Sequence, residues 1–446
     1  MATRKLASWA VSLEHTSLPP TVTTAALRSL YNYIGCAIGG SGHLTVSKAH
    51  SALSPFFGHP QATLFGRSTR IDAPHAALLN GIASHVHDYD DTHLATIIHP
   101  TGPVASAALA YAQYAGPVSG PQLLTALTAG IEASCKLGLA VWPAHYDIGW
   151  HITSTTGSIG AAVAVGKLLS LNESQMAHAI GLASVQVIGL REMFGSDTKS
   201  FHPGRAAQAG LTAAIMASKD FTSSEVALEA KRGWANVVAG GGEPHLDRYI
   251  AQLGHEWEVE RNAFKPFPCG IVCHPAIDGC IQLHSEIKDQ GLSVKDIEKV
   301  DASVHPLVIE LTSKRTPRDG LEGKFSVFHG CTVGLLYGKA TPAEYADGVV
   351  LSAEVVALRD RCHAHPDQKL SVDAVDIVVT FKDGRKLQKH VDHAIGSLEL
   401  PMSSEQLTDK FVDQCSPVSG DKTQEISDLC WTIGKANDVA DILKRL

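Results

Sequence analysis

The densest group of titratable residues in the chain lies in one segment, His85 to Gly102, which reads HVHDYDDTHLATIIHPTG. Apolar residues recur at helical spacing upstream of it, beginning after Asp72, a residue type that caps helices. The aspartates of the segment are therefore expected at the end of a buried helix. Negative side chains are unfavourable at a helix C-terminus unless cations or hydrogen-bond donors surround them. The segment is thus a candidate functional site.

Three interpretations of this segment remain open from the spacing alone. His87 and Asp91 lie four residues apart, and such a pair can hold a divalent metal. Histidine also titrates nearest neutrality, so a metal-free acid–base site is the second interpretation. The third is a solvated helix end whose polar residues only form hydrogen bonds.

Three other segments add chemically active residue types. They are Trp142 to Ser154 with Tyr146 and His151, Arg191 to Arg205 with Lys199 and His202, and Lys265 to Gly279 with Cys269, Cys273 and His274. The first two lie between Ala- and Gly-rich helices, where loops either converge on a pocket or stay on the surface. The single Cys-x-x-x-Cys spacing of the third segment argues against zinc. His274 is a candidate for proton transfer, or else a hydrogen-bonded residue at a helix start.

The composition excludes several classes of protein. The chain has 446 residues, 44% of them hydrophobic, and a formal net charge of -8 without any basic run, which argues against a nucleic-acid surface. No apolar run is expected to span a membrane, and Glu14 interrupts the N-terminal segment before a secretory signal could form. Nine scattered cysteines suit reduced thiols in a cytoplasmic protein. No glycine-rich segment has the context of a nucleotide-binding loop, so no cofactor is predicted.

The sequence predicts a mainly α-helical fold with a smaller α+β part. Residues 1–261 are expected to form most of a helical domain, residues 262–395 an α+β lid domain, and residues 396–446 a helical tail that returns to the first domain. Asn172 and Gln175 predict a capping box. Within the lid, alternation predicts a strand over 300–311, and the Asp383-Gly384 pair predicts a hairpin turn.

Six motifs in this order resemble the MmgE/PrpD family. They are DYDDTH from Asp88, HPTG from His99, GWH ending at His151, LREMFGSDTKSFHPGRAAQAG from Leu190, KPFPCGIVCHPAIDG from Lys265 and KFSVFHGCTVGLLYG from Lys324. The resemblance covers almost the whole chain. It implies a large helical domain, a smaller lid domain, a homodimer, and an enzyme without a required organic cofactor or metal that acts on a small di-, tri- or tetracarboxylate.

The resemblance also implies site residues. Matched motif by motif, the catalytic positions of the decarboxylases in this family correspond to Asp88, Thr92, His99, His151, Lys199 and His274. Additional candidates for binding the substrate's carboxylates are Tyr146, Arg191 and Lys265. The sequence departs from the decarboxylase pattern in two places: one extra residue separates Thr92 from His99, and the residues that follow His151 differ.

The reactions of this family share a carbanion next to a carboxylate, which a positioned base must generate and cations must stabilise. Lys199 is the first candidate for a cation or proton carrier, because burial between helices lowers a lysine's pKa. The chain length and the two departures favour an iminodisuccinate-type epimerase. The alternatives are a lyase, either 2-methylcitrate dehydratase or cis-aconitate decarboxylase, and a non-catalytic carboxylate-binding scaffold.

Overall fold

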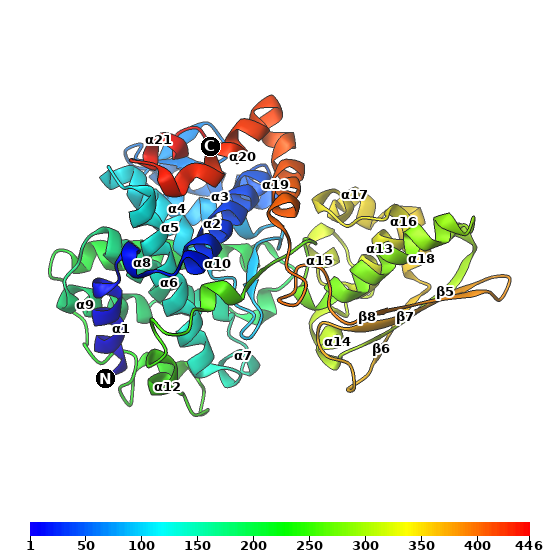
Figure 1. Ribbon diagram of the computed structural model, residues 1–446, viewed down its shortest axis with the longest axis horizontal. Helices are drawn as coiled ribbons and strands as arrows, with labels where there is room; N and C mark the ends of the chain where they lie inside the picture. Colours follow the sequence, from blue (N-terminus) through cyan, green and yellow to red (C-terminus); the bar gives the residue numbers. More distant parts are fainter.

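The structure is a computed structural model that describes residues 1–446, and its helices dominate two bodies of unequal size. The largest hydrophobic cluster joins the first 264 residues to the C-terminal tail, whereas a second cluster lies between Phe267 and Val391. Figure 1 shows the two bodies side by side, with the C-terminal helices against the N-terminal ones. The predicted mainly α fold with a smaller α+β part is confirmed.

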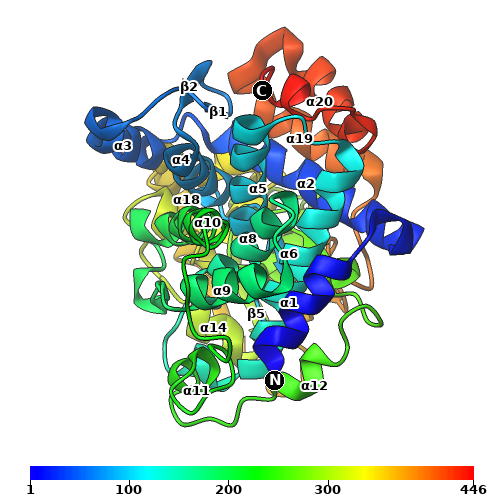
Figure 2. The ribbon, with the colours of Figure 1, turned by 90° about the vertical axis from the view of Figure 1, so that its left-hand side faces the viewer.

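The larger body holds most of the helices and only short strands. It consists of α1 (Ala2–Ser12), α2 (Pro20–Gly40), α3 (Leu44–Leu53), β1 (Ala62–Leu64), β2 (Thr69–Ile71), α4 (Ala73–His85), β3 (Asp91–His93), α5 (Thr101–Ala115), α6 (Gly120–Val141), α7 (Ala144–Asp147), α8 (Ile152–Leu168), α9 (Glu173–Ser184), α10 (Asp197–Ala217), α11 (Trp234–Val238), α12 (Leu246–Ile250), β4 (Asn262–Phe264), α19 (Ser404–Ser419), α20 (Thr423–Thr432) and α21 (Ala440–Leu443). Figure 2 views this body end on, with α8 surrounded by α5, α6, α9 and α10.

The smaller body is a four-stranded sheet with helices packed on it. It consists of α13 (His274–Asp289), β5 (Ile297–Val304), α14 (Pro306–Thr312), α15 (Gly320–Gly323), α16 (Val327–Tyr337), α17 (Asp347–Val350), α18 (Ala353–Arg359), β6 (Cys362–Pro366), β7 (Val375–Phe381) and β8 (Lys386–Val391). The strand order is β6-β5-β7-β8, with only β5 and β6 parallel. The predicted hairpin at Asp383-Gly384 joins β7 to β8.

Two sequence-based expectations need correction. The strand predicted over 300–311 ends at Val304, because Pro306 begins α14 and its fixed φ suits a first helical turn. The alternating apolar residues after Pro306 therefore lie on a helix.

Contrary to the expectation of no membrane-length segment, α6 is long and apolar enough to cross a membrane by length and composition, but 94% of its apolar window is buried inside the protein. Its packing is that of a core helix.

The close packing of α4 on α10 depends on two glycines. A Cβ on Gly81 would lie 2.5 Å from the Cα atom of Gly204, and a Cβ on Gly204 would lie 2.3 Å from the carbonyl oxygen of Leu78. Any larger residue would force the helices apart. This approach brings the C-terminal end of α4, with His85, to the first turn of α10, with Lys199.

The pairing of β3 with β4 joins two distant parts of the chain. Asp91 lies opposite Phe264 in this antiparallel pair, so Lys265 follows directly beside the turn that carries Asp88. In that turn Asp88 has a φ of +52°, in the left-handed region that aspartate adopts more readily than most residues. The turn reverses the chain between α4 and β3 and directs the Asp88 carboxylate toward Lys265.

The C-terminal tail holds the same region from the other side. Helix α19 packs on α2, and the Nζ of its Lys410 donates to the carbonyl oxygens of Tyr89 at 2.6 Å and Lys265 at 2.8 Å, and to the side chain of Asn32. The tail is thus bonded to both segments that carry the Asp88–Lys265 contact.

Candidate active site

Two lysines share one buried carboxylate at the centre of the site. The Oδ1 atom of Asp88 accepts from the Nζ of Lys265 at 2.6 Å and lies 3.0 Å from the Nζ of Lys199. Burial alone would raise the pKa of Asp88, but the two ammonium groups outweigh it and hold the pKa well below the ordinary value. Asp88 is therefore ionised at neutral pH, and two positive charges face one negative charge.

The two lysines differ in their free donors. Lys265 donates to the Asp88 carboxylate, to the carbonyl oxygen of Asp88 and to that of Cys269, which uses all three N–H groups. Lys199 has two neighbours within bonding distance, Asp88 and His85, so one of its N–H groups stays free. Lys265 is thus arranged to hold Asp88, whereas Lys199 is arranged to act on a ligand.

His85 links Lys199 to a second carboxylate. Its Nδ1 lies 2.7 Å from the Oδ2 of Asp90, and its Nε2 lies 2.9 Å from the Nζ of Lys199. Because an ionised carboxylate can only accept, Nδ1 carries the proton and Nε2 accepts from Lys199. Burial is the main cause of the lowered pKa of His85 and of Lys199. The result is a continuous chain from Asp90 through His85 and Lys199 to Asp88.

His99 presents an accepting nitrogen to the same carboxylate. Its Nδ1 lies 2.9 Å from the carbonyl oxygen of Asp91, which can only accept, so Nε2 is unprotonated and faces Asp88 at 3.9 Å. The hydroxyl of Thr92 lies 3.3 Å from Nδ1 and completes the support of the ring. Burial holds the pKa of His99 well below its usual value, so the neutral ring can accept a proton.

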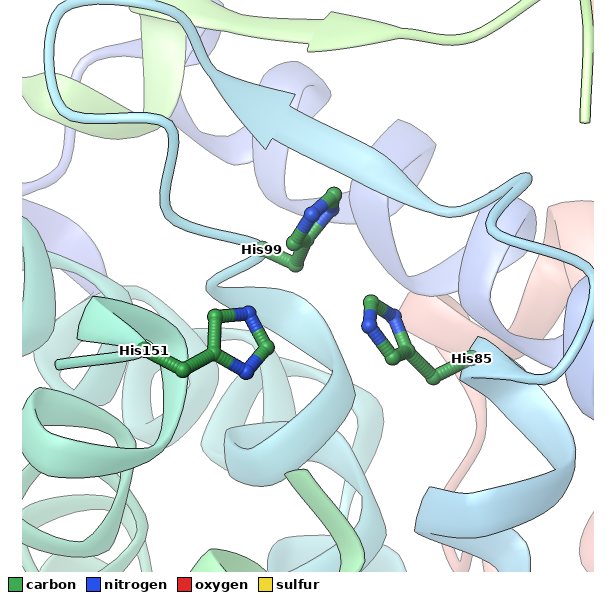
Figure 3. Close-up of side chains that lie close together, drawn as sticks. All are labelled: His85, His99 and His151. Atoms are coloured by element: carbon green, nitrogen blue, oxygen red, sulfur yellow. The ribbon is translucent and has the colours of Figure 1, made fainter. Parts of the chain in front are cut away.

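His151 forms a pair with a second histidine. The Nδ1 atoms of His151 and His202 lie 2.9 Å apart, so one of the two rings donates a hydrogen bond and the other accepts it. Burial lowers the pKa of His202 to about 4 and holds that of His151 well below its usual value, so both rings are neutral at neutral pH. Figure 3 shows His85, His99 and His151 pointing toward a common space from three separate segments.

The cavity at these side chains has a lining that is part polar and part apolar. Asp88, His99, His151, Lys199 and Lys265 form the polar part, and Phe194, Phe325, Val272 and Leu311 form the apolar part, which we call the apolar wall. The rings of Phe194 and Phe325 stack with centroids 5.6 Å apart, and the Nζ of Lys199 lies 5.4 and 5.6 Å from them. The cavity volume is only about 40 Å³.

The remaining predicted residues lie around this cavity at different depths. Tyr146 lines it, and the guanidinium of Arg191 stacks over the Tyr146 ring at 4.1 Å while pairing with Glu310. Arg191 is therefore one layer behind the cavity. His274 lines a different cavity next to this one, and apart from the neighbouring thiol of Cys269 its ring nitrogens have no hydrogen-bond partner in the protein. The roles assigned to these three residues remain predictions.

Three histidines also bring ring nitrogens within 4.8 Å of one another, close enough for a shared metal ion. However, both nitrogens of His85 are engaged, one by Asp90 and one by Lys199, and Nδ1 of His99 is held by a carbonyl. A cation at His85 would have to displace the Lys199 amine. The donor set therefore suits proton transfer better than metal binding. The His87–Asp91 pair is not available either, because α4 ends at His85 and Asp91 lies in β3.

Sequence reasoning missed several residues of this site as functional. His85, Asp90 and His202 lie in the quoted motifs, but no periodicity distinguishes them from neighbours such as His87. The start of the helix that carries His85 was predictable from the cap at Asp72, which the structure confirms through its bond to the amide of His75. The pairing of His85 with Lys199 was not predictable from the sequence, because it depends on the contact of α4 with α10.

Comparisons with known proteins agree with the motifs. Residues 4–247 match the model of the MmgE/PrpD N-terminal domain, and residues 267–433 match that of the MmgE/PrpD C-terminal domain. Cis-aconitate decarboxylase of Mus musculus is 26% identical over 440 residues, covering 94% of this chain and 88% of the relative. The human cis-aconitate decarboxylase is 28% identical, with 78% and 74% covered. The 2-methylcitrate dehydratase of Escherichia coli K12 is 25% identical, with 78% and 76% covered.

Proposed function

The chain belongs to the MmgE/PrpD family, and on this premise we propose that it is a lyase that decarboxylates a small tricarboxylate such as cis-aconitate. The observation that carries the proposal is the position of Lys199, which has a free N–H and lines a small cavity together with Asp88, two neutral histidines and two phenyl rings.

The charge balance of the cavity suits a polyanion. Asp88 and the ionised Asp90 carry two negative charges beside Lys199 and Lys265, and a third buried lysine, Lys324, donates to the carbonyl oxygen of His87 at 2.9 Å. Burial lowers the pKa of Lys324 to about 7. A substrate carboxylate would bind the free donor of Lys199, and its charge would keep Lys324 protonated.

The apolar wall suits the loss of carbon dioxide. A carboxylate held against Phe194 and Phe325 loses its hydration, which favours a reaction that converts it into neutral CO₂. The carbon–carbon bond breaks, and its electron pair passes into the carbanion conjugated with the neighbouring carboxylate. Lys199 supplies the proton that the carbon then needs. His85, whose Nε2 lies 2.9 Å from the amine, is placed to return a proton to Lys199.

Dehydration is the second candidate, because one relative is a 2-methylcitrate dehydratase. In that reaction Nε2 of His99 would take the proton α to a carboxylate and Lys199 would protonate the leaving hydroxyl, a division of roles that agrees with the tautomer inferred from the bond of Nδ1 to the Asp91 carbonyl. The iminodisuccinate-type epimerase, favoured by length and motif departures, and the non-catalytic scaffold receive no support from the relatives, whose names are those of lyases.

Proton NMR in D2O distinguishes these reactions. The purified protein is incubated separately with cis-aconitate, 2-methylcitrate and iminodisuccinate. Decarboxylation of cis-aconitate gives itaconate, seen by its vinylic CH2 signals, with deuterium at one carbon. Dehydration of 2-methylcitrate turns its methyl doublet into a singlet on a fully substituted double bond. Deuterium exchange in iminodisuccinate without either product would contradict the lyase proposal and favour the epimerase. No reaction in any tube would favour the scaffold.

A further inference from the structure

A second cavity lies beside the catalytic one and is about ten times larger. Its volume is about 400 Å³, and it lies between the two bodies, lined by residues from the loop after β3, the end of α6, the start of α13, α14 and the segment 394–399. Its walls are mainly apolar, with Trp142, Leu307, Ala394 and Ile395 among them. A dry cavity of roughly 150 Å³ is enough to bind benzene, so this space can hold several carbons.

The two cavities share a wall of three aliphatic side chains, Ile97, Ile271 and Val272. Ile97 has a φ of +58°, which is strained for a β-branched residue. Its loop is fixed on both sides, because the amide of His93 donates to the carbonyl of Ile98 at 2.7 Å and the amide of His99 donates to Thr153. The fold therefore holds the Ile97 side chain at the boundary at the expense of backbone strain.

A buried polar group faces the larger cavity. His274 is 2% exposed and lines this space, and apart from the neighbouring thiol of Cys269 its ring nitrogens have no hydrogen-bond partner in the protein. Buried polar groups without partners are rare and indicate a ligand or another group that satisfies them. The occupant of the cavity thus has an apolar part and at least one polar group that reaches His274.

From these observations we propose that the larger cavity binds the hydrocarbon substituent of the substrate, so that the protein selects an alkyl-substituted polycarboxylate. The catalytic cavity, at about 40 Å³, has no room for the whole molecule. The carboxylates reach Lys199 on one side of Ile97 and His274 on the other, and the alkyl chain extends toward Leu307 and Ala394. This assignment rests on the proposed function for the position of the carboxylate head.

Binding of two unreactive probes, succinate and 2-hexylsuccinate, tests the proposal by isothermal titration calorimetry. Each buried methylene contributes about 0.8 kcal/mol, or roughly fourfold in affinity, so partial burial of the chain gives 2-hexylsuccinate a dissociation constant about 50-fold or more below that of succinate. Dissociation constants within about twofold of each other would overturn the proposal.

Filling the cavity identifies where the chain binds. Ala394→Leu is expected to reduce the preference for 2-hexylsuccinate to below about tenfold, whereas Ala25→Leu, the same change at a partly buried position outside this cavity, leaves it intact. Val372→Phe is a second variant, at a cavity residue that is 38% exposed and so tolerates a larger side chain. An undiminished preference in both cavity variants would also overturn the proposal.

Turnover separates this proposal from the proposed function. If cis-aconitate and 2-methylcitrate are not converted but 2-hexylsuccinate keeps its preference and loses it in Ala394→Leu, the cavity assignment stands and the lyase assignment fails. If turnover occurs but the alkyl chain adds no affinity, the lyase assignment stands and the cavity assignment fails.

Discussion

The protein buries two clusters of charged side chains, and their contrast separates structural from catalytic charge. In one, which we call the inner cluster, the Nζ of Lys136 lies 2.6 Å from Glu258, and His93 bonds both Glu258 and Thr96. In the other, which we call the site cluster, Asp88 faces both Lys199 and Lys265. Both clusters are almost completely buried. Burial of charge is therefore not what distinguishes a functional site.

The difference lies in access. The inner cluster is bonded by Gln252 and Arg261 as well, and none of its four members lines one of the major cavities. The site cluster opens into a cavity through Asp88, Lys199 and Lys265. A buried ion pair is costly when one partner is removed. The same Lys→Met substitution should therefore affect stability in one cluster and chemistry in the other.

Lys199→Met is expected to have the largest effect on activity. Removal of the proton carrier should lower kcat by about 100-fold or more, the range typical of general acid–base groups. Asp88 keeps its bond to Lys265 in this variant, so the midpoint of urea unfolding should change little. Initial rates of itaconate formation from cis-aconitate measure the first effect. Full activity in a folded Lys199→Met variant would remove Lys199 from the mechanism.

Lys136→Met should affect stability instead. It removes the buried cation of Glu258 and leaves only the exposed Arg261 at 3.5 Å, which is expected to cost about 3 kcal/mol in the free energy of unfolding. The activity of the folded fraction should stay within about threefold of the parent protein, because Lys136 does not line the catalytic cavity. Denaturant titration and active-site-normalised rates measure the two quantities. A stable but inactive variant would contradict the contrast between the clusters.

Asp90→Asn should have an intermediate effect through His85. The amide can donate as well as accept, so Nδ1 of His85 no longer has a fixed proton and Nε2 is less often free to accept from Lys199. We expect kcat to fall about 10- to 100-fold with little change in KM, together with a shifted pH profile. A purely structural role for Asp90 would instead leave the pH profile of the remaining activity unchanged.

Glu132→Gln should have the smallest effect, on how stability depends on pH. Burial raises the pKa of Glu132 from 4.5 to about 7. Between these pH values the folded state holds more protons than the unfolded state, so this group makes stability fall as pH rises. Glutamine does not titrate, so between pH 5 and 8 the variant should lose about 1–3 kcal/mol less stability than the parent. Parallel urea titrations at pH 5 and pH 8 measure the free energy of unfolding of the parent and the variant. Equal losses of stability in the two proteins would show that Glu132 does not titrate in this range.

Local patterns predicted the helices better than the site. Asn172 and Gln175 form the predicted capping box, because both partners are neighbours in sequence. The strand predicted over 300–311 was partly wrong, since alternation does not distinguish a strand from a short helix that starts at a proline. The motifs indicated Asp88, His99 and Lys199, and the structure brings these three together.

The parts of the site that sequence could not predict depend on contacts between distant segments. The amine of Lys199 meets His85 only because two glycines let their helices touch. Lys265 was assigned to substrate, but its three donors are taken by the protein, a fact that depends on the turn at Asp88 and on the carbonyl of Cys269. His274 lies in the neighbouring cavity because α13 begins in the smaller body.

The bonds of Lys410 have a consequence for synthesis in the cell. This residue of α19 ties together the carbonyls of Tyr89 and Lys265, yet the ribosome adds it more than a hundred residues after Lys265. While Lys410 is still inside the exit tunnel, the emerged chain contains every residue of the site cluster. It still lacks the hydrogen bonds from Lys410 to the carbonyls of Tyr89 and Lys265. Nascent chains are thus expected to acquire a fully formed site only at the end of translation, which keeps unfinished molecules from consuming substrate.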